Sequence, residues 1–262
     1  MGAEENEIKK YWDDRALSDS SKQSTTQDVF LREIEMRVLI EAIEKSRAKV
    51  ILDAGCGDGQ TTLALSRHFP NRKFIGFDFA PSMIGNAKKN CTSQDSNVKF
   101  FVHDVTLPIP VKPELVYSTR CLINLPTRAA QAEALDRIYE CLGSFGEYVM
   151  IENFIEGQQA LNILRANFEL AEIPIRFHNN FFSRDWLNSY CHNKWSLLEE
   201  ANISSSYYMV TRVVYSRLCK DRNIEPDYFD PINKYASLLP FSGEYGPVRY
   251  LYFKKCDLPR EI

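Results

Sequence analysis

The sequence predicts an α/β fold in which a doubly wound, mostly parallel sheet is covered by helices on both faces. Between residues 48 and 151, short apolar runs alternate with longer stretches of helical periodicity. This alternation is typical of strands joined by right-handed helical crossovers. The apolar runs show little alternation of apolar and polar positions, as expected of strands that are buried on both faces.

The N-terminal segment, residues 1–47, is predicted to be helical and to lie as a lid before the sheet. Apolar residues recur near the helical period between Val29 and Ile43. Thr26 or Asp28 is suitably placed to cap the start of this helix.

The central region supplies the predicted strands and their crossovers. The strands are expected at 49–54, 73–77, 98–102, 115–118 and 148–151, with helices between them at 60–68, 81–90 and 127–142. Pro81 stands where a first helical turn tolerates proline, and Thr127 is a candidate N-cap.

The C-terminal region is less regular. A helix is predicted near 157–170, a β-rich run at 204–218 and a last strand at 248–254. The gap between the fifth strand and residue 204 is long for a simple crossover, so we expect a cap inserted at the carboxyl edge of the sheet. The predicted parts are a lid at 1–47, a core at 48–153, a cap at 154–203 and C-terminal strands completing the sheet at 204–262.

Composition excludes several classes of protein. The 262 residues include 32 Lys and Arg against 35 Asp and Glu, a net charge of −3, which argues against a general nucleic-acid binder. We expect no signal peptide and no membrane span, because no apolar run reaches about 18 residues. The seven cysteines are dispersed, without a C-x-x-C pair. These features predict a cytoplasmic protein with reduced thiols and no bound metal.

The most informative element is a glycine loop in which Gly55, Gly57 and Gly59 alternate with other residues between an apolar run and a helix. Glycines allow a tight turn and close approach of a ligand, and the helix start offers free N–H groups to an anion. Asp78 ends the next apolar run, where a carboxylate suits the hydroxyls of a ribose. Together they predict nucleoside binding at a topological switch point.

The spacing of the glycines distinguishes two kinds of nucleoside site. A dinucleotide fingerprint requires glycine or alanine at position 60, where this chain has Gln60. The G-x-G-x-G spacing instead resembles motif I of class I S-adenosylmethionine-dependent methyltransferases. Further segments resemble later motifs of that family in order: FIGFDFAPSMIGNAKKN (74–90), KFFVHDVTLPIP (99–110), LVYSTRCLINL (115–125) and LGSFGEYVMIEN (142–153). One departure is the turn before the fifth strand, Gly143-Ser144-Phe145-Gly146, where relatives often have Gly-Gly.

The resemblance implies a Rossmann-like, seven-stranded sheet whose last strand is antiparallel, with S-adenosylmethionine as cofactor. The glycines would line its methionine part and Asp53 would order their loop. Asp78 would bind the ribose, and Phe79 and Met83 would flank the adenine. The remaining implied cofactor residues are Asp104 at the adenine amino group, Arg120 and Cys121 at the reactive end, and Cys56 and Val105 beside them.

The acceptor side is expected from the lid and the cap. His178 is the candidate general base, because imidazole titrates near neutrality, although a structural histidine is the alternative. Strand ends that face a crevice are where such folds bind substrates. The candidate substrate-binding residues are Tyr11, Trp12, Asn124, Glu152, Asn153, Asn179 and Asn180.

The segments TRCLINLP and RFHNNFF resemble methyltransferases that modify bacterial surface saccharides or their phosphoryl groups. We therefore predict O-methylation of a small polar acceptor, a saccharide or a phosphoryl compound. The alternatives are N-methylation of a small amine, an NAD-dependent oxidoreductase, and a non-catalytic cofactor-binding module. Nucleic-acid methylation is disfavoured, since no Asn/Asp-Pro-Pro-aromatic motif is present. The aromatic C-terminal runs, Ser205 to Tyr215 and Tyr250 to Phe253, are compatible with a homodimer interface or a place beneath the cap.

Overall fold

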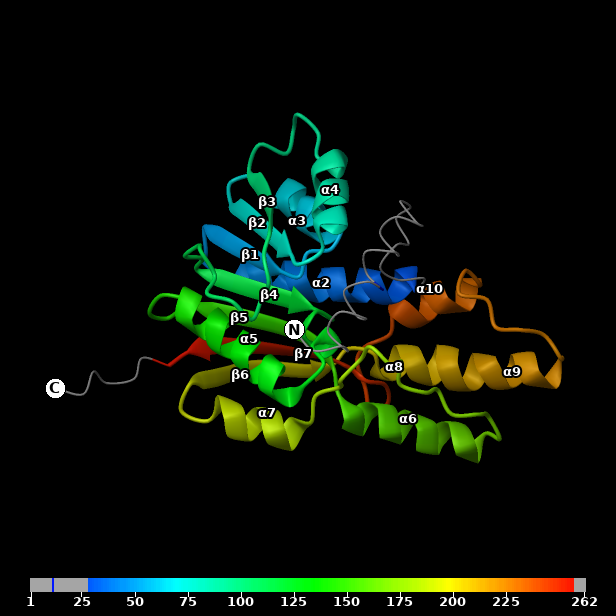
Figure 1. The fold of residues 1–262 in the computed structure, drawn as a ribbon. Coiled ribbons are helices and arrows are strands. Elements are labelled where there is room, and N and C mark those ends of the chain that lie inside the picture. The colour runs from blue at the N-terminus through cyan, green and yellow to red at the C-terminus, as the bar shows by residue number, and fades with distance from the viewer. Residues whose placement is uncertain (1–10, 12–27, 257–262) are drawn as a thin grey trace.

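The computed structural model describes residue 11 and residues 28–256, which are built around one seven-stranded sheet (Figure 1). The strands are β1 (Val50–Ala54), β2 (Lys73–Asp78), β3 (Val98–Val102), β4 (Leu115–Thr119), β5 (Glu147–Asn153), β6 (Trp195–Asn202) and β7 (Val248–Lys255). Their order is β3-β2-β1-β4-β5-β7-β6. Strands β1 to β5 pair in parallel, and β7 is antiparallel to both β5 and β6. The predicted fold class is confirmed.

Helices cover both faces of the sheet. The helices are α2 (Val29–Lys45), α3 (Gln60–His68), α4 (Pro81–Asn90), α5 (Arg128–Cys141), α6 (Ile155–Asn167), α7 (Arg184–Cys191), α8 (Ser205–Tyr208), α9 (Tyr215–Asp221) and α10 (Pro231–Ser237), with a short 3₁₀ turn at Leu122–Asn124 and a π-helix, η2, at Met209–Val214. Helices α5 and α7 pack on one face, and α2 packs on the other. Successive residues of the central strands alternate between these two cores. Leu52 belongs to the first core and Ile51 to the second.

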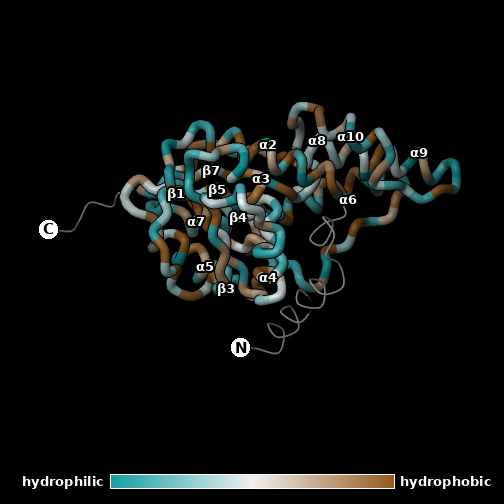
Figure 2. The backbone as a smooth tube through the Cα atoms, turned by 90° about the horizontal axis from the view of Figure 1, so that it is seen from above, coloured by the Kyte–Doolittle hydropathy of each residue, from teal (hydrophilic) through white to brown (hydrophobic). Residues whose placement is uncertain are grey.

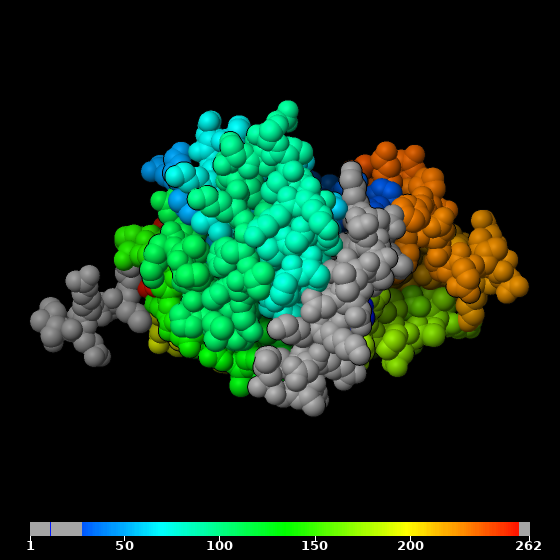
Figure 3. Space-filling view, turned by 45° about the horizontal axis from the view of Figure 1, so that its top comes forward, coloured from blue at the N-terminus to red at the C-terminus, as the bar shows by residue number. Residues whose placement is uncertain are grey.

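A group of helices lies beyond the carboxyl ends of the parallel strands. Helices α6, α8, α9 and α10 gather there in both views of the backbone (Figures 1 and 2). In the space-filling view, α9 and α10 form a lobe beside the part of the molecule that contains the sheet (Figure 3). This group provides one side of the cavity described below.

The predicted helix starts are confirmed where the structure describes them. The Asp28 carboxylate accepts a hydrogen bond from the Leu31 N–H at the start of α2. The Thr127 hydroxyl accepts one from the Ala130 N–H at the start of α5. Pro81 is the first residue of α4. Thr26 lies outside the described residues, as does most of the predicted lid.

The prediction of a β-rich run at 204–218 is wrong, because this segment is helical and includes η2. Tyr207, Thr211 and Val213 are buried there, at separations of 4 and 2 residues that would also place them on one face of a strand, so periodicity did not reveal the helix. The sixth strand instead lies at β6, within the residues expected to form only a cap. β6 is an edge strand in which Trp195 and Asn202 alone are buried, so its sequence lacks the apolar signal of a central strand.

The aromatic run at 250–253, which was considered for a dimer interface, is buried in the fold. Tyr250, Leu251, Tyr252 and Phe253 lie in β7 between two other strands, with 3 to 6% of each residue exposed. They contribute to the core instead of offering a surface to a second copy.

All seven cysteines are free, and the described residues include no helix long and apolar enough to cross a bilayer.

A close backbone contact fixes the start of α6 and gives a test of the fold. A Cβ added at Gly157 would lie 2.0 Å from the carbonyl oxygen of Gly246. We expect Gly157→Ala to lower the free energy of unfolding by about 1–3 kcal/mol, measured by urea unfolding, because the backbones must separate. Gly85→Ala in α4 is the control, since no atom lies within 4 Å of its added Cβ. It should stabilise the protein by roughly 0.5–1 kcal/mol through helix propensity. Equal effects of the two substitutions would contradict the prediction.

Candidate active site

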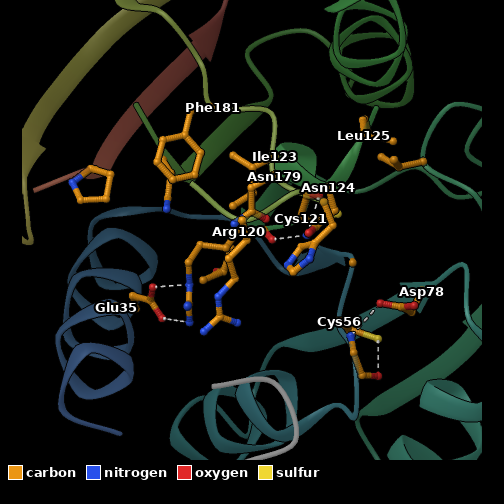
Figure 4. A pocket seen from close by; sticks show the side chains of 18 of the residues that line it. Glu35, Cys56, Asp78, Arg120, Cys121, Ile123, Asn124, Leu125, Asn179 and Phe181 are labelled. Atoms are coloured by element: carbon orange, nitrogen blue, oxygen red, sulfur yellow. Dashed lines mark hydrogen bonds and ion pairs between the residues drawn. The ribbon is translucent and has the colours of Figure 1, made fainter. Parts of the chain in front are cut away.

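A cavity of about 970 Å³ opens at the carboxyl ends of the parallel strands. It lies at the topological switch point, where the crossovers after β1 and β4 depart in opposite directions along the sheet. In Figure 4, Asp78 and Cys56 lie on one side of the cavity and Arg120 and Glu35 on the other. Of the predicted cofactor residues, all but Gly59 line it: Asp53, Gly55, Cys56, Gly57, Asp78, Phe79, Met83, Asp104, Val105, Arg120 and Cys121.

The glycine loop has a backbone that other residues rarely adopt. Gly55, Gly57 and Gly59 have φ angles of 80°, 54° and 75°. A Cβ at Gly55 would lie 2.2 Å from the Cys121 Sγ, and one at Gly59 would meet the Phe100 ring at 2.7 Å. Gly59 thus allows the loop to pack closely against the Phe100 ring and does not form part of the cavity wall. The loop is held to β2, since the N–H groups of Gly55 and Cys56 both donate to the Phe77 carbonyl.

Two carboxylates organise this loop. Asp78 accepts hydrogen bonds from the N–H groups of Gly57 at 3.0 Å and Ala80 at 2.9 Å. Asp53 lies behind the loop and accepts from the hydroxyls of Thr62 and Tyr117. Burial raises the pKa of Asp53 to about 7, although both hydroxyls act to lower it. Asp53 therefore connects β1, α3 and β4 beneath the loop.

The turn after β4 is held in a strained conformation. Arg120 has a φ of 48°, which is uncommon for a residue with a side chain. Its N–H donates to the Ile151 carbonyl, and its guanidinium forms an ion pair with Glu35 of α2 at 2.8 Å. Strained residues persist where surrounding contacts over-determine them, often at functional sites.

Glu152 is the predicted site residue whose position differs most from expectation. It does not line the cavity and is completely buried. Its carboxylate accepts hydrogen bonds from the N–H groups of Cys121, Leu122 and Ile123 and from the Ser118 hydroxyl. Glu152 therefore positions the turn that carries Cys121 and Asn124 into the cavity (Figure 4).

The other predicted substrate residues divide into two groups. Asn124, Asn153, Asn179 and His178 line the cavity. Asn180 does not, because its N–H and carbonyl bond to Ile123 and to the Gln131 side chain.

The predicted lid residues are described only in part. Tyr11 stacks on the His178 ring, with ring centroids 4.5 Å apart. Trp12 lies outside the described residues.

Several cavity residues were not predicted from the sequence. Glu35 is one of them, and only 3% of it is exposed. Its spacing from Leu31 and Val38 on the buried side of α2 is the signal that could have identified it. Other lining residues that were not among the predicted site residues are Arg32, Thr119, Arg176, Tyr208, Arg212 and Tyr228.

Comparison with known proteins agrees with this geometry. Residues 51–146 match a family described as "Methyltransferase domain". Residues 51–146 form a class I S-adenosylmethionine-dependent methyltransferase domain. The domain contains the glycine loop, Asp78 and the turn after β4, and it ends just before β5.

The curated relatives resemble mainly this domain. Malonyl-(acyl-carrier protein) O-methyltransferase 2 of Ilyobacter polytropus is 25% identical over 163 residues, which cover 61% of this chain and 60% of that protein. Demethylmenaquinone methyltransferase of Thermus thermophilus is 29% identical over 111 residues, or 42% of this chain and 50% of that protein. The chain thus spans less than two thirds of these relatives.

Solved structures match the fold over a longer part of the chain. The N-methyltransferase NodS from Bradyrhizobium japonicum, crystallised with S-adenosyl-L-homocysteine, has a TM-score of 0.60 and 12% identity. The match covers 95% of this chain and 99% of NodS. At this identity the likeness establishes the fold alone.

Glu152 gives a test of how the turn after β4 is positioned. Burial raises the pKa of Glu152 to about 7, from an ordinary value of 4.5, although the N–H groups of the turn lower it. Because the folded-state pKa is the higher, folding favours the protonated form. The stability that this proton linkage supplies is complete below about pH 4.5 and is lost as the pH rises through 7.

We expect Glu152→Gln to weaken this pH dependence, as measured by urea unfolding at pH 5 and pH 8. At pH 5 the variant should be less stable by about 1–3 kcal/mol, because its amide N–H₂ faces backbone donors. The difference should shrink at pH 8. Glu225→Gln, at an exposed residue, is the control. The same pH dependence in wild type and Glu152→Gln would exclude this role.

Proposed function

We propose that the chain is an S-adenosylmethionine-dependent methyltransferase that methylates an oxygen of a small polar acceptor, a saccharide or a phosphoryl-containing metabolite. The observation that carries the proposal is the single cavity, in which the glycine loop and Asp78 share one space with polar and cationic side chains. Alignment of two reactants in one site is the main requirement of a displacement reaction.

The residues at the end of the cavity that the glycine loop forms fit the cofactor. The glycines leave bare backbone beside Asp78, which suits a ribose. Three buried oxygens on the cavity wall have no hydrogen-bond partner among the described residues: Thr119 Oγ1, Asn124 Oδ1 and Asn153 Oδ1. Buried polar atoms generally require partners, and ammonium or hydroxyl groups of bound molecules would provide them.

In this proposal each end of the cavity has a defined task. When bound, the cofactor supplies a methyl group on a positively charged sulfur. Asp78 would accept hydrogen bonds from the ribose hydroxyls, Phe79 and Met83 would flank the adenine, and Asp104 would accept from its amino group. Glu152 acts through the backbone, because it holds the turn that carries Cys121.

The acceptor oxygen is activated by His178. As the new carbon–oxygen bond forms and the methyl–sulfur bond breaks, the acceptor hydroxyl would transfer its proton to the imidazole. His178 lines the cavity and is 5% exposed, and the Tyr11 ring lies against it. The stacked ring restricts the orientation of the imidazole, which a general base requires.

The similar proteins support a small acceptor without identifying it. Curated relatives carry the names of methyltransferases for malonyl-(acyl-carrier protein), trans-aconitate and demethylmenaquinone. Their acceptors differ from one another, so the choice of acceptor depends on the residues of this chain's own cavity.

We expect Asp78→Asn to bind S-adenosylhomocysteine about 10- to 100-fold more weakly than wild type in isothermal titration, since charge-assisted hydrogen bonds are lost. Asp136→Asn is the matched control, because that carboxylate pairs with Lys194 on the surface. Failure of the wild-type protein to bind S-adenosylmethionine or S-adenosylhomocysteine would overturn the proposed function. Unchanged affinity of Asp78→Asn would remove only its role at the ribose.

We expect His178→Gln to reduce turnover by about 10²- to 10⁴-fold if this histidine is the base. The measurement is the release of S-adenosylhomocysteine with a panel of sugars and sugar phosphates, from pH 5 to 9. The acid limb of the wild-type pH profile should disappear in the variant. A profile and rate equal to wild type would exclude His178 as the base.

A further inference from the structure

Three side chains on the cavity wall carry hydrogen-bonding atoms that no described residue uses. Thr119 ends β4, Asn153 ends β5 and Tyr208 ends α8, and all three line the cavity. The Thr119 Oγ1 and the Asn153 Oδ1 are buried without a partner among the described residues. The Tyr208 ring contacts Tyr207 and Arg212, yet its hydroxyl bonds to none of the described residues. We call these three residues the polar corner.

The fold brings the polar corner to one face of the sheet. Thr119 pairs in register with Ile151, two residues before Asn153, so all three side chains point to the face that α2 covers. Tyr208 packs against the same core. A Cβ added at Gly246 would lie 3.1 Å from the Tyr208 ring, and Gly246 lies just before β7, the strand that pairs with β5. Elements distant in sequence therefore meet at one place on the cavity wall.

The charged groups that act on the Tyr208 hydroxyl are already paired. Arg120 forms its ion pair with Glu35, and Arg212 forms one with Asp28. Burial and the Asp28 carboxylate raise the pKa of Tyr208 more than the two guanidinium groups lower it. The phenol therefore keeps its proton at neutral pH and can donate a hydrogen bond. Because each arginine has its own carboxylate, these groups give no preference for a charged ligand.

The polar corner offers both donors and acceptors. The Tyr208 O–H donates, the Asn153 amide has an N–H₂ group and a carbonyl oxygen, and the Thr119 hydroxyl can do either. A carboxylate or phosphoryl oxygen only accepts, and an ammonium group only donates, so each would leave part of the corner without a partner. A hydroxyl does both. Since buried polar groups without partners are costly, neighbouring hydroxyls of one ligand match the corner best.

We propose that the acceptor is a neutral polyol of the saccharide type, whose neighbouring hydroxyls bind at the polar corner with Tyr208 as a donor. The inference rests on the proposed methyl transfer and narrows its acceptor class, because it sets phosphoryl compounds and amines aside. Hydrogen bonds to hydroxyls beside the reacting one orient the acceptor for methyl transfer. A site built to bind hydroxyls also rejects ligands that lack them.

The test compares neutral polyols with charged probes that lack neighbouring hydroxyls. The full chain, saturated with S-adenosylhomocysteine, is titrated by calorimetry with D-glucose, D-galactose, D-mannose and myo-inositol, and then with methyl phosphate, glutarate and putrescine. We expect at least one polyol to bind about tenfold more tightly than every charged probe. A charged probe that binds as tightly as the best polyol, or no binding of any polyol, would overturn the inference.

Variants connect the preference to the polar corner. Tyr208→Phe and Asn153→Ala should each reduce the affinity of the best polyol roughly 3- to 10-fold, the loss of a hydrogen bond. Tyr208→Phe should unfold at the same urea concentration as wild type, since its hydroxyl bonds to no described residue. This separates a role in binding from one in folding.

Tyr190→Phe is the matched control. The Tyr190 hydroxyl donates to the Ala132 carbonyl, and the residue does not line the cavity. Its loss should leave polyol affinity unchanged. Wild-type polyol affinity in both Tyr208→Phe and Asn153→Ala would contradict the assignment of the corner.

The binding of S-adenosylhomocysteine is measured first in every protein. A wild-type chain that fails to bind it overturns the proposed function. A chain that binds it and yet does not prefer polyols overturns only the present inference.

Discussion

The close approach of the chain after β1 to the chain after β4 is the constraint on which the cavity depends. The two strands pair in register as far as Ala54 and Ser118, and their crossovers then depart in opposite directions. Just beyond this point Gly55 passes Cys121 so closely that a Cβ would lie 2.2 Å from its Sγ. Any side chain at position 55 would push the two turns apart. Glu152 holds the second turn from behind through three backbone N–H groups, so the narrow crossing is fixed from both sides.

Around this crossing, buried charged side chains position neighbouring elements more than they stabilise the fold. A buried ion pair recovers little of the free energy that desolvation of its two charges costs. The pairs Glu35–Arg120 and Asp28–Arg212 nevertheless tie α2 to the turn after β4 and to η2. Asp28 also caps α2 and accepts from the Tyr207 hydroxyl, so one carboxylate connects the start of that helix to the C-terminal helices. The outcome is that the Arg120 and Arg212 guanidinium groups have defined directions on the cavity wall.

Much of the cofactor half could be predicted because its signals are local. The glycine loop, Asp78 and the caps Asp28 and Thr127 each follow from the conformation of a few adjacent residues. The residues of the acceptor half were harder to predict from the sequence. The segment 204–218 is rich in β-branched and aromatic residues, yet it folds as a helix in which Tyr207, Thr211 and Val213 are buried. Glu152 was expected in the cavity, although a carboxylate at a strand end can equally turn inward when three backbone donors lie there.

The sequence by itself determined the five parallel strands with their crossovers, the nucleoside-type loop and the class of domain, because backbone preferences and hydrophobic periodicity act over short distances. Only the tertiary structure decided which charges are buried and which face the cavity. Glu35 meets Arg120 across 85 residues of sequence and Asp28 meets Arg212 across 184, and neither partner predicts the other. A charged side chain tolerates burial only where a counter-charge arrives from another element, and that arrival depends on the packing of the whole chain.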